Sequence, residues 1–180
     1  MRKITAHLFS SVDGVVESPN LFQFDSFGER EGELMTEAMD GASAAIMGRV
    51  IYSQWADYWP QNNEDFGLVI NPMKKYVASS TLSGELAWEN STLIDGDLID
   101  FVTELKAGDG GDVIVCGISV IAQLLAADLL DELILTVHPV FMGEGRSLYD
   151  SLEAPLRLEL VRSEATPVGN AFLTYRKRSD

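Results

Sequence analysis

One short segment, residues 112–121, constrains the fold more than any other part of this chain. Residues 113–116 form an unbroken apolar run, which is typical of a strand buried on both faces of a parallel sheet. Gly117 follows, and residues 120–130 have the apolar spacing of a helix. A strand that passes through a glycine into a helix presents unpaired helix N–H groups at the sheet edge, and such groups suit a phosphate. We therefore expect an α/β fold with an anion-binding turn here.

The remainder of the sequence alternates between the two patterns. Asp97 can cap a helix whose apolar face carries Leu98, Phe101, Val102 and Leu105. Strands are expected over 3–10, 43–47, 74–78, 92–94, 113–116 and 132–137, helices over 29–39, 50–58, 98–106 and 120–130, an irregular segment over 61–71, and an antiparallel hairpin of 156–163 and 171–178. This order predicts one domain over residues 1–180, with a mostly parallel sheet, helices on both faces and a C-terminal antiparallel hairpin.

Charge and cysteine content narrow the classes of partner. The formal net charge is −15, and an acidic surface repels nucleic acid and anionic membranes. No apolar stretch reaches the ~18 residues that a membrane helix needs. The single cysteine, Cys116, rules out an internal disulfide and fits a reducing compartment. We therefore expect a cytoplasmic protein that binds a small molecule and neither nucleic acid nor membrane.

Several polar residues follow the predicted strands, where ligands bind in parallel sheets. Arg49 could hold a phosphate as a bidentate donor or pair with a surface acid. Ser79 and Ser80 could donate to a phosphate or cap a turn. Ser119 could cap the following helix or donate to a phosphate. Asp13 could contact a reacting group or organise its own turn.

Other candidates have simple structural interpretations. His7 and His138 lie on or beside apolar strands and are expected to be structural, since no metal-ligand spacing joins them. Cys116 is expected to act as a small buried hydrophobe. Trp55, Tyr58 and Trp59 could line a pocket for a flat ring or belong to the core.

Taken in order, these motifs resemble a known family. The stretches that carry the likeness are 11–14, 46–52, 77–81, 112–121, 130–133 and 137–149, of which Leu-Asp-Glu-Leu at 130–133 and His-Pro-Val with Gly-Glu-Gly-Arg at 138–146 are the most specific. The chain resembles the RibD C-terminal domain family in its stand-alone form, the reductase domain of riboflavin biosynthesis, over nearly its whole length. The resemblance implies a three-layer dihydrofolate reductase-like fold, an NADPH site and a homodimer formed through the sheet edge.

The resemblance also implies roles for individual residues. Gly48 and Arg49 would lie near the cofactor phosphates, Ser79 and Ser80 beside the adenosine 2′-phosphate, and Gly117, Ile118, Ser119, Val120 and Ile121 at the pyrophosphate. The Asp13-Gly14 loop would cover the nicotinamide and substrate, with Asp13 as the candidate that positions substrate or relays a proton. Tyr52, Trp55 and Tyr58 are candidates for the substrate pocket.

Three departures from the family pattern bear on function. Ile118 is bulky where a small residue is common, and Asp128 replaces a common glycine. Residues 53–65 hold no lysine or arginine and three acids, which disfavours a phosphate there. We predict an NADPH-dependent reductase of a small heterocyclic substrate, resembling 5-amino-6-(5-phosphoribosylamino)uracil reductase. The substrate is expected to differ from that phosphorylated pyrimidine unless Arg30 alone binds it. The alternatives are a non-catalytic dinucleotide- or small-molecule-binding protein and a structural oligomer.

Overall fold

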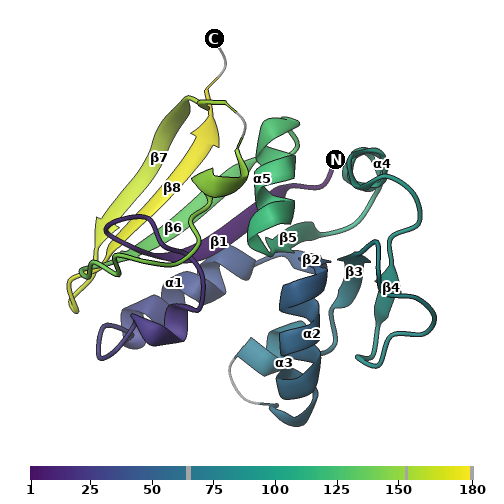
Figure 1. Ribbon diagram of the computed structural model, residues 1–180, viewed down its shortest axis with the longest axis horizontal. Helices are drawn as coiled ribbons and strands as arrows, with labels where there is room; N and C mark the ends of the chain where they lie inside the picture. Colours follow the sequence, from purple (N-terminus) through teal and green to yellow (C-terminus); the bar gives the residue numbers. More distant parts are fainter. Residues whose placement is uncertain (64–65, 153, 179–180) are drawn as a thin grey trace.

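Eight strands form a single sheet in the computed structural model, which describes residues 1–63, 66–152 and 154–178 (Figure 1). The strands are β1 (Ile4–Ser11), β2 (Ala42–Gly48), β3 (Lys74–Ala78), β4 (Ser91–Leu93), β5 (Asp112–Cys116), β6 (Glu132–His138), β7 (Leu158–Ala165) and β8 (Ala171–Lys177). Their order across the sheet is β4-β3-β2-β5-β1-β6-β8-β7. The first six are parallel, and β8 and β7 add an antiparallel edge, which confirms the predicted fold class.

Helices cover both faces of this sheet (Figure 1). Helices α4 (Leu98–Ala107) and α5 (Ile118–Ala126) pack on one face, where Val102, Ile121 and Leu124 join the inward side chains of β1, β2 and β5. Helices α1 (Glu29–Met39), α2 (Arg49–Tyr58) and α3 (Phe66–Ile70) cover the other face. Because β5 is buried on both sides, it needs the continuous apolar run that its sequence carries.

Sequence patterns located most elements closely. Helix α1 and strand β3 have the predicted bounds, and the carboxylate of Asp97 caps α4 by accepting hydrogen bonds from the N–H groups of Ile99 and Asp100. The segment 61–71 was expected to be irregular, which is wrong for Phe66–Ile70, a short helix; residues 64 and 65 lie outside the described residues. Within the described ranges, no helix combines the length and apolar character needed to cross a membrane.

Helix α5 differs from its expected bounds at both ends. It begins at Ile118 and ends at Ala126, whereas 120–130 was predicted. Asp128 takes a left-handed conformation with φ of 62°, and the N–H groups of Asp128 and Leu129 donate to the carbonyls of Leu125 and Leu124. This paired arrangement terminates helices and usually carries glycine at the left-handed position, so the polar Asp128 conceals the helix end in the sequence.

Candidate active site

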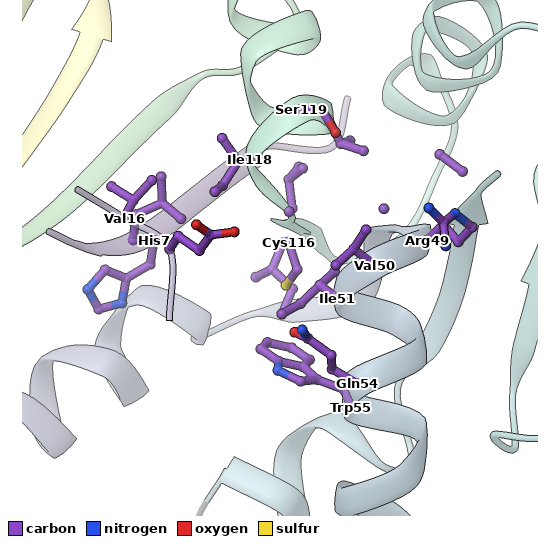
Figure 2. A pocket seen from close by; sticks show the side chains of 18 of the residues that line it. His7, Val16, Arg49, Val50, Ile51, Gln54, Trp55, Cys116, Ile118 and Ser119 are labelled. Atoms are coloured by element: carbon purple, nitrogen blue, oxygen red, sulfur yellow. The ribbon is translucent and has the colours of Figure 1, made fainter. Parts of the chain in front are cut away.

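A cleft of about 1120 Å³ opens at the carboxyl edge of the parallel strands. The ends of β1, β2, β3 and β5 reach it, together with the first residues of α2 and α5. Figure 2 shows Arg49 and Ser119 on one side of this cleft, His7 and Val16 on the opposite side, and Gln54 and Trp55 projecting from α2 in the lower part of the view. Strands that run parallel bring their carboxyl ends together, so the residues after each strand meet here, although the sequence separates them widely.

The turn between β5 and α5 approaches the turn between β2 and α2 closely. Gly117 has φ of 111°, which side chains rarely adopt, and a Cβ on it would lie 3.3 Å from the backbone nitrogen of Gly48. The first N–H groups of α5, on Ile118, Ser119 and Val120, have no intrahelical acceptors and border the cleft. Gly117 is the N-cap and no side chain caps the helix, so Ser119 does not serve as the cap.

The two helices that begin at the cleft have unusual first turns for so acidic a chain. Helices α1 and α4 carry Glu or Asp in their first turns, as the helix dipole favours. Helices α2 and α5 carry none, and α2 begins with a cation, Arg49. The Arg49 side chain is exposed, lines the cleft and forms no ion pair within the described part of the chain. These two helix starts together form a positive region suited to an anion.

The loop after β3 adds hydroxyl groups to the same side. The Ser79 hydroxyl oxygen accepts hydrogen bonds from the N–H groups of Thr81 and Leu82, at 3.1 and 2.9 Å, so Ser79 caps this turn. Its own proton is still available to a ligand, because a hydroxyl donates one hydrogen bond while it accepts others. Ser80 also lines the cleft.

The Asp13 carboxylate contacts a neighbouring loop. It accepts hydrogen bonds from the Ser11 hydroxyl and from the N–H groups of Met142 and Gly143, the latter two at 3.1 and 2.7 Å. The Ser11 hydrogen bond, followed by these backbone bonds, lowers the pKa of Asp13 to about 2. Neither Asp13 nor Gly14 is among the residues that line the cleft. This geometry corresponds to the expectation that Asp13 organises its own turn.

The remaining predicted site residues divide between cleft and core. Trp55 lines the cleft and packs edge to face on Phe66, with ring centroids 5.2 Å apart. Tyr52 is buried, and its hydroxyl accepts a hydrogen bond from the backbone N–H of Trp88 at 3.1 Å. Gly48 and Gly117 line the cleft, whereas Ile121 lies within α5 with its side chain fully buried in the core. Tyr58 is mostly exposed outside the cleft lining.

His7 is an uncharged polar group within the cleft. Its Nε2 lies 2.9 Å from the Thr136 hydroxyl, and burial together with the nearby His138 lowers the pKa of His7 to about 4. Burial also raises the pKa of the Cys116 thiol to about 12, so this thiol stays protonated at the base of the cleft. Both groups are therefore neutral at physiological pH.

A buried polar network supports the wall formed by residues 18–27. His138 is fully buried, and its Nδ1 lies 2.7 Å from the Ser26 hydroxyl. The Asn170 side-chain amide donates to the Ser26 carbonyl at 2.6 Å and to the Glu31 carboxylate at 2.8 Å. The Asn170 bonds satisfy the Ser26 carbonyl and join this loop, whose Phe22 is fully buried, to the turn between β7 and β8.

Two charged residues that lie at the cleft were not predicted from the sequence. Glu17 and Arg146 both line it, and Glu17 directly follows Val16 in the chain. Arg146 lies in the Gly-Glu-Gly-Arg stretch at 143–146, and its place in that motif was the available sign in the sequence that it could have a role. Arg30, by contrast, is not in the lining: its guanidinium bonds to Glu33, Glu37 and Glu164.

The family of the chain follows from its sequence as a whole. Residues 2–172 match the RibD C-terminal domain. The chain belongs to the RibD C-terminal domain family. This confirms the resemblance inferred from the ordered motifs.

Individual relatives of this family extend the comparison. The uncharacterised protein YyaP of Bacillus subtilis is 26% identical, over 97% of this chain and 94% of its own length. A Shewanella sp. PV-4 protein named for riboflavin biosynthesis has a TM-score of 0.75 at 20% identity, covering 98% of this chain and 99% of its own.

Two further structures place the fold. The Thermotoga maritima diaminohydroxyphosphoribosylaminopyrimidine deaminase/5-amino-6-(5-phosphoribosylamino)uracil reductase has a TM-score of 0.69 at 13% identity, covering 98% of this chain and 57% of that longer one. Enterococcus faecalis dihydrofolate reductase, solved with NADP(H), has a TM-score of 0.59 at 14% identity, covering 98% and 97%. At these identities the likeness establishes a shared dihydrofolate reductase-like fold.

Proposed function

We propose that this protein is an NADPH-dependent reductase of a small heterocyclic substrate. The observation that carries the proposal is the start of α5 at Gly117, which has no acid in its first turn and packs against Gly48. Arg49, which forms no ion pair with the residues that the structure describes, lies in the same cleft. A dinucleotide carries phosphates that need N–H donors and a cation, and this region offers both. Two proteins of similar fold support the chemistry, since one is named as a reductase and the other was solved as a complex with NADP(H).

The residues on the Arg49 side of the cleft fit this cofactor. The backbone N–H groups of Ile118, Ser119 and Val120 would donate to the pyrophosphate. Gly117 permits the pyrophosphate to approach the backbone closely, and the bulky side chain of Ile118 does not prevent this. Arg49, with the Ser79 and Ser80 hydroxyls, would bind the 2′-phosphate.

The rest of the cleft would then hold the reacting groups. The bound cofactor supplies a hydride to the substrate. Trp55 and Gln54 would orient a flat ring, and the neutral His7 would remain available as a hydrogen-bonding group. We assign Asp13 a positioning role, because its carboxylate holds the loop at Met142 and Gly143 in place.

A non-catalytic dinucleotide- or small-molecule-binding protein is the second candidate. Asp13 bonds to loop groups and His7 stays neutral, so neither serves as a charged proton donor at physiological pH. Oxidation of NADPH at 340 nm across a panel of carbonyl, imine and pterin compounds separates the two functions. Binding without turnover of any compound would favour the second.

Calorimetric titration with NADPH and NADH tests the cofactor site. Arg49→Ala should weaken NADPH binding about 10- to 100-fold, since charge-assisted hydrogen bonds contribute roughly 1.5–3 kcal/mol. NADH lacks the 2′-phosphate, so its affinity should hardly change. Arg176→Ala is the matched control, because Arg176 pairs with Glu159 outside the cleft lining. Unchanged NADPH affinity in Arg49→Ala, or an equal loss for NADH, would contradict this assignment.

We further propose that the protein acts in the cytoplasm as a homodimer. Strand β7 is paired on one side only, and its Leu160 and Val161 are about half exposed, at 51% and 50%. A second copy would cover this apolar edge. Sedimentation equilibrium with Val161→Glu measures the effect on assembly.

A further inference from the structure

Glu17 and Arg146 occupy the end of the cleft that the proposed cofactor groups leave open. Figure 2 separates Val16 and His7 from Arg49 and Ser119 across the cleft, and Glu17 directly follows Val16. Among the described residues that line the cleft, the charged side chains are Glu17, Arg49 and Arg146. If Arg49 holds the cofactor phosphate, the other end has one carboxylate, one guanidinium and no net charge.

Backbone bonds hold these two residues together. The Val16 N–H donates to the Arg146 carbonyl at 2.9 Å, and the Arg146 N–H donates to the Glu17 carboxylate at 3.3 Å. An isolated bridge pairs Val15 with Ser147 beside them. The Asp13 carboxylate fixes the same loop at Gly143. The two loops are therefore positioned by main-chain contacts and by Asp13, not by a salt bridge between the charged groups.

The charged groups themselves remain available to a ligand. Both side chains are exposed in the cleft wall. Within the described ranges no hydrogen bond or ion pair fixes the Arg146 guanidinium, although its charge, after the hydrogen bonds from Ser147, contributes to lowering the pKa of Asp150, which is not among the cleft-lining residues. The Glu17 carboxylate has only the long backbone bond there. A carboxylate beside a guanidinium whose N–H groups bind no described residue offers an acceptor and a planar donor on one edge.

We propose that Glu17 and Arg146 recognise the –NH–C(=O)– edge of an uncharged, unphosphorylated cyclic amide. Glu17 accepts from the ring N–H and Arg146 donates to the adjacent carbonyl. A phosphate placed here would face the Glu17 carboxylate, and the repulsion would offset its attraction to Arg146. The inference rests on the proposed function, which assigns the Arg49 end to the cofactor, and it names the substrate class of the same site.

Two nucleosides and one nucleotide test this recognition: uridine, N3-methyluridine and uridine 5′-phosphate. They differ only in the ring N–H or in the phosphate. Binding is followed by Trp fluorescence and by saturation-transfer NMR, with the protein alone and with NADPH present. Uridine should bind about tenfold or more tightly than either analogue, because each analogue loses a charge-assisted bond or adds a repulsion.

Glu17→Gln and Arg146→Gln provide the protein side of the test. Glu17→Gln should shrink the penalty of N3-methylation and strengthen binding of uridine 5′-phosphate. Arg146→Gln should lower the affinity for uridine about tenfold and leave the ratio of the affinities for uridine and N3-methyluridine unchanged. Glu144→Gln removes a nearby exposed carboxylate that does not line the cleft and should change nothing. Thermal melting of each variant verifies that it is folded.

Failure of the proposal is distinguishable from failure of the proposed function. Absence of uridine binding in either state, equal binding of N3-methyluridine, tighter binding of uridine 5′-phosphate, or Glu17→Gln behaving as Glu144→Gln would each overturn the inference. Glu17-dependent uridine binding by a protein that does not bind NADPH would refute the cofactor assignment and leave the recognition intact.

Discussion

Gly117→Ala probes the feature on which the proposed cofactor site depends, the close approach of two turns. At φ of 111° and ψ of 125°, a residue with a side chain is strained by roughly 1–3 kcal/mol. The new Cβ would also lie 3.3 Å from the Gly48 nitrogen and 3.4 Å from the Ile51 side chain, so the Gly48 turn must shift by a few tenths of an ångström. We expect a total loss of about 2 kcal/mol, which lowers Tm by about 4–8 °C in a chain of this size.

The same substitution should weaken NADPH binding about tenfold or more. The shift moves the N–H groups at the start of α5 relative to Arg49, and charge-assisted bonds of roughly 1.5–3 kcal/mol are at stake. Thermal melting followed by circular dichroism and calorimetric titration measure the two effects on one preparation.

Gly84→Ala is the matched control for backbone strain. Gly84 has φ of 79°, and a Cβ there would meet no atom within 4 Å. It should cost about 1 kcal/mol, or 2–4 °C in Tm, and leave NADPH affinity unchanged. If Gly117→Ala matched Gly84→Ala in both measurements, the contact between the Gly117 and Gly48 turns could not be what builds the phosphate site.

Two further predictions concern stability. Asp128→Gly should raise the free energy of unfolding by about 0.5–1 kcal/mol in urea titration, because it relieves the left-handed φ of 62° at the end of α5. The substitution also removes the ion pair with Lys177, which is 3.3 Å long and contributes little because the Asp128 side chain is exposed. A decrease in stability would show that this ion pair outweighs the strain. His7 has a folded pKa of about 4 against an ordinary value of 6.5, so the unfolded chain binds more protons between these values and stability should fall as pH drops from 6.5 to 4. His7→Gln should flatten that slope in urea titrations at a series of pH values, and an unaltered slope would exclude His7 as its source.

Local sequence patterns were sufficient to predict a helix or strand where the residues of that element alone determine its position. The apolar spacing of α1, the Asp97 cap of α4 and the apolar run of β5 were all readable from short windows. The end of α5 was not, because Asp128 adopts a conformation usually left to glycine. The short helix α3 was also missed, since five residues are too few for a helical period to show.

The candidate site depends on contacts that no window contains. The sequence indicates a polar Asp13 in a turn but not whether it faces a ligand, since its partners Met142 and Gly143 lie 129 and 130 residues away. Glu17 and Arg146 are likewise 129 residues apart, and only the fold brings them together. Arg30 was a reasonable phosphate ligand until the structure showed its guanidinium bonded to three glutamates.

The Asn170 bonds to Ser26 and Glu31 bear on the order in which the molecule is completed. Every strand end that meets the proposed cofactor has been synthesised once the growing chain reaches Cys116. The opposite wall depends on the side-chain amide of Asn170, near the end of the chain. While the chain is still emerging from the ribosome, the half proposed to bind phosphate has all its residues long before the wall at 18–27 has its anchor, Asn170. A chain shortened before the β7–β8 turn would therefore retain the residues of the first half and lose the support of the second.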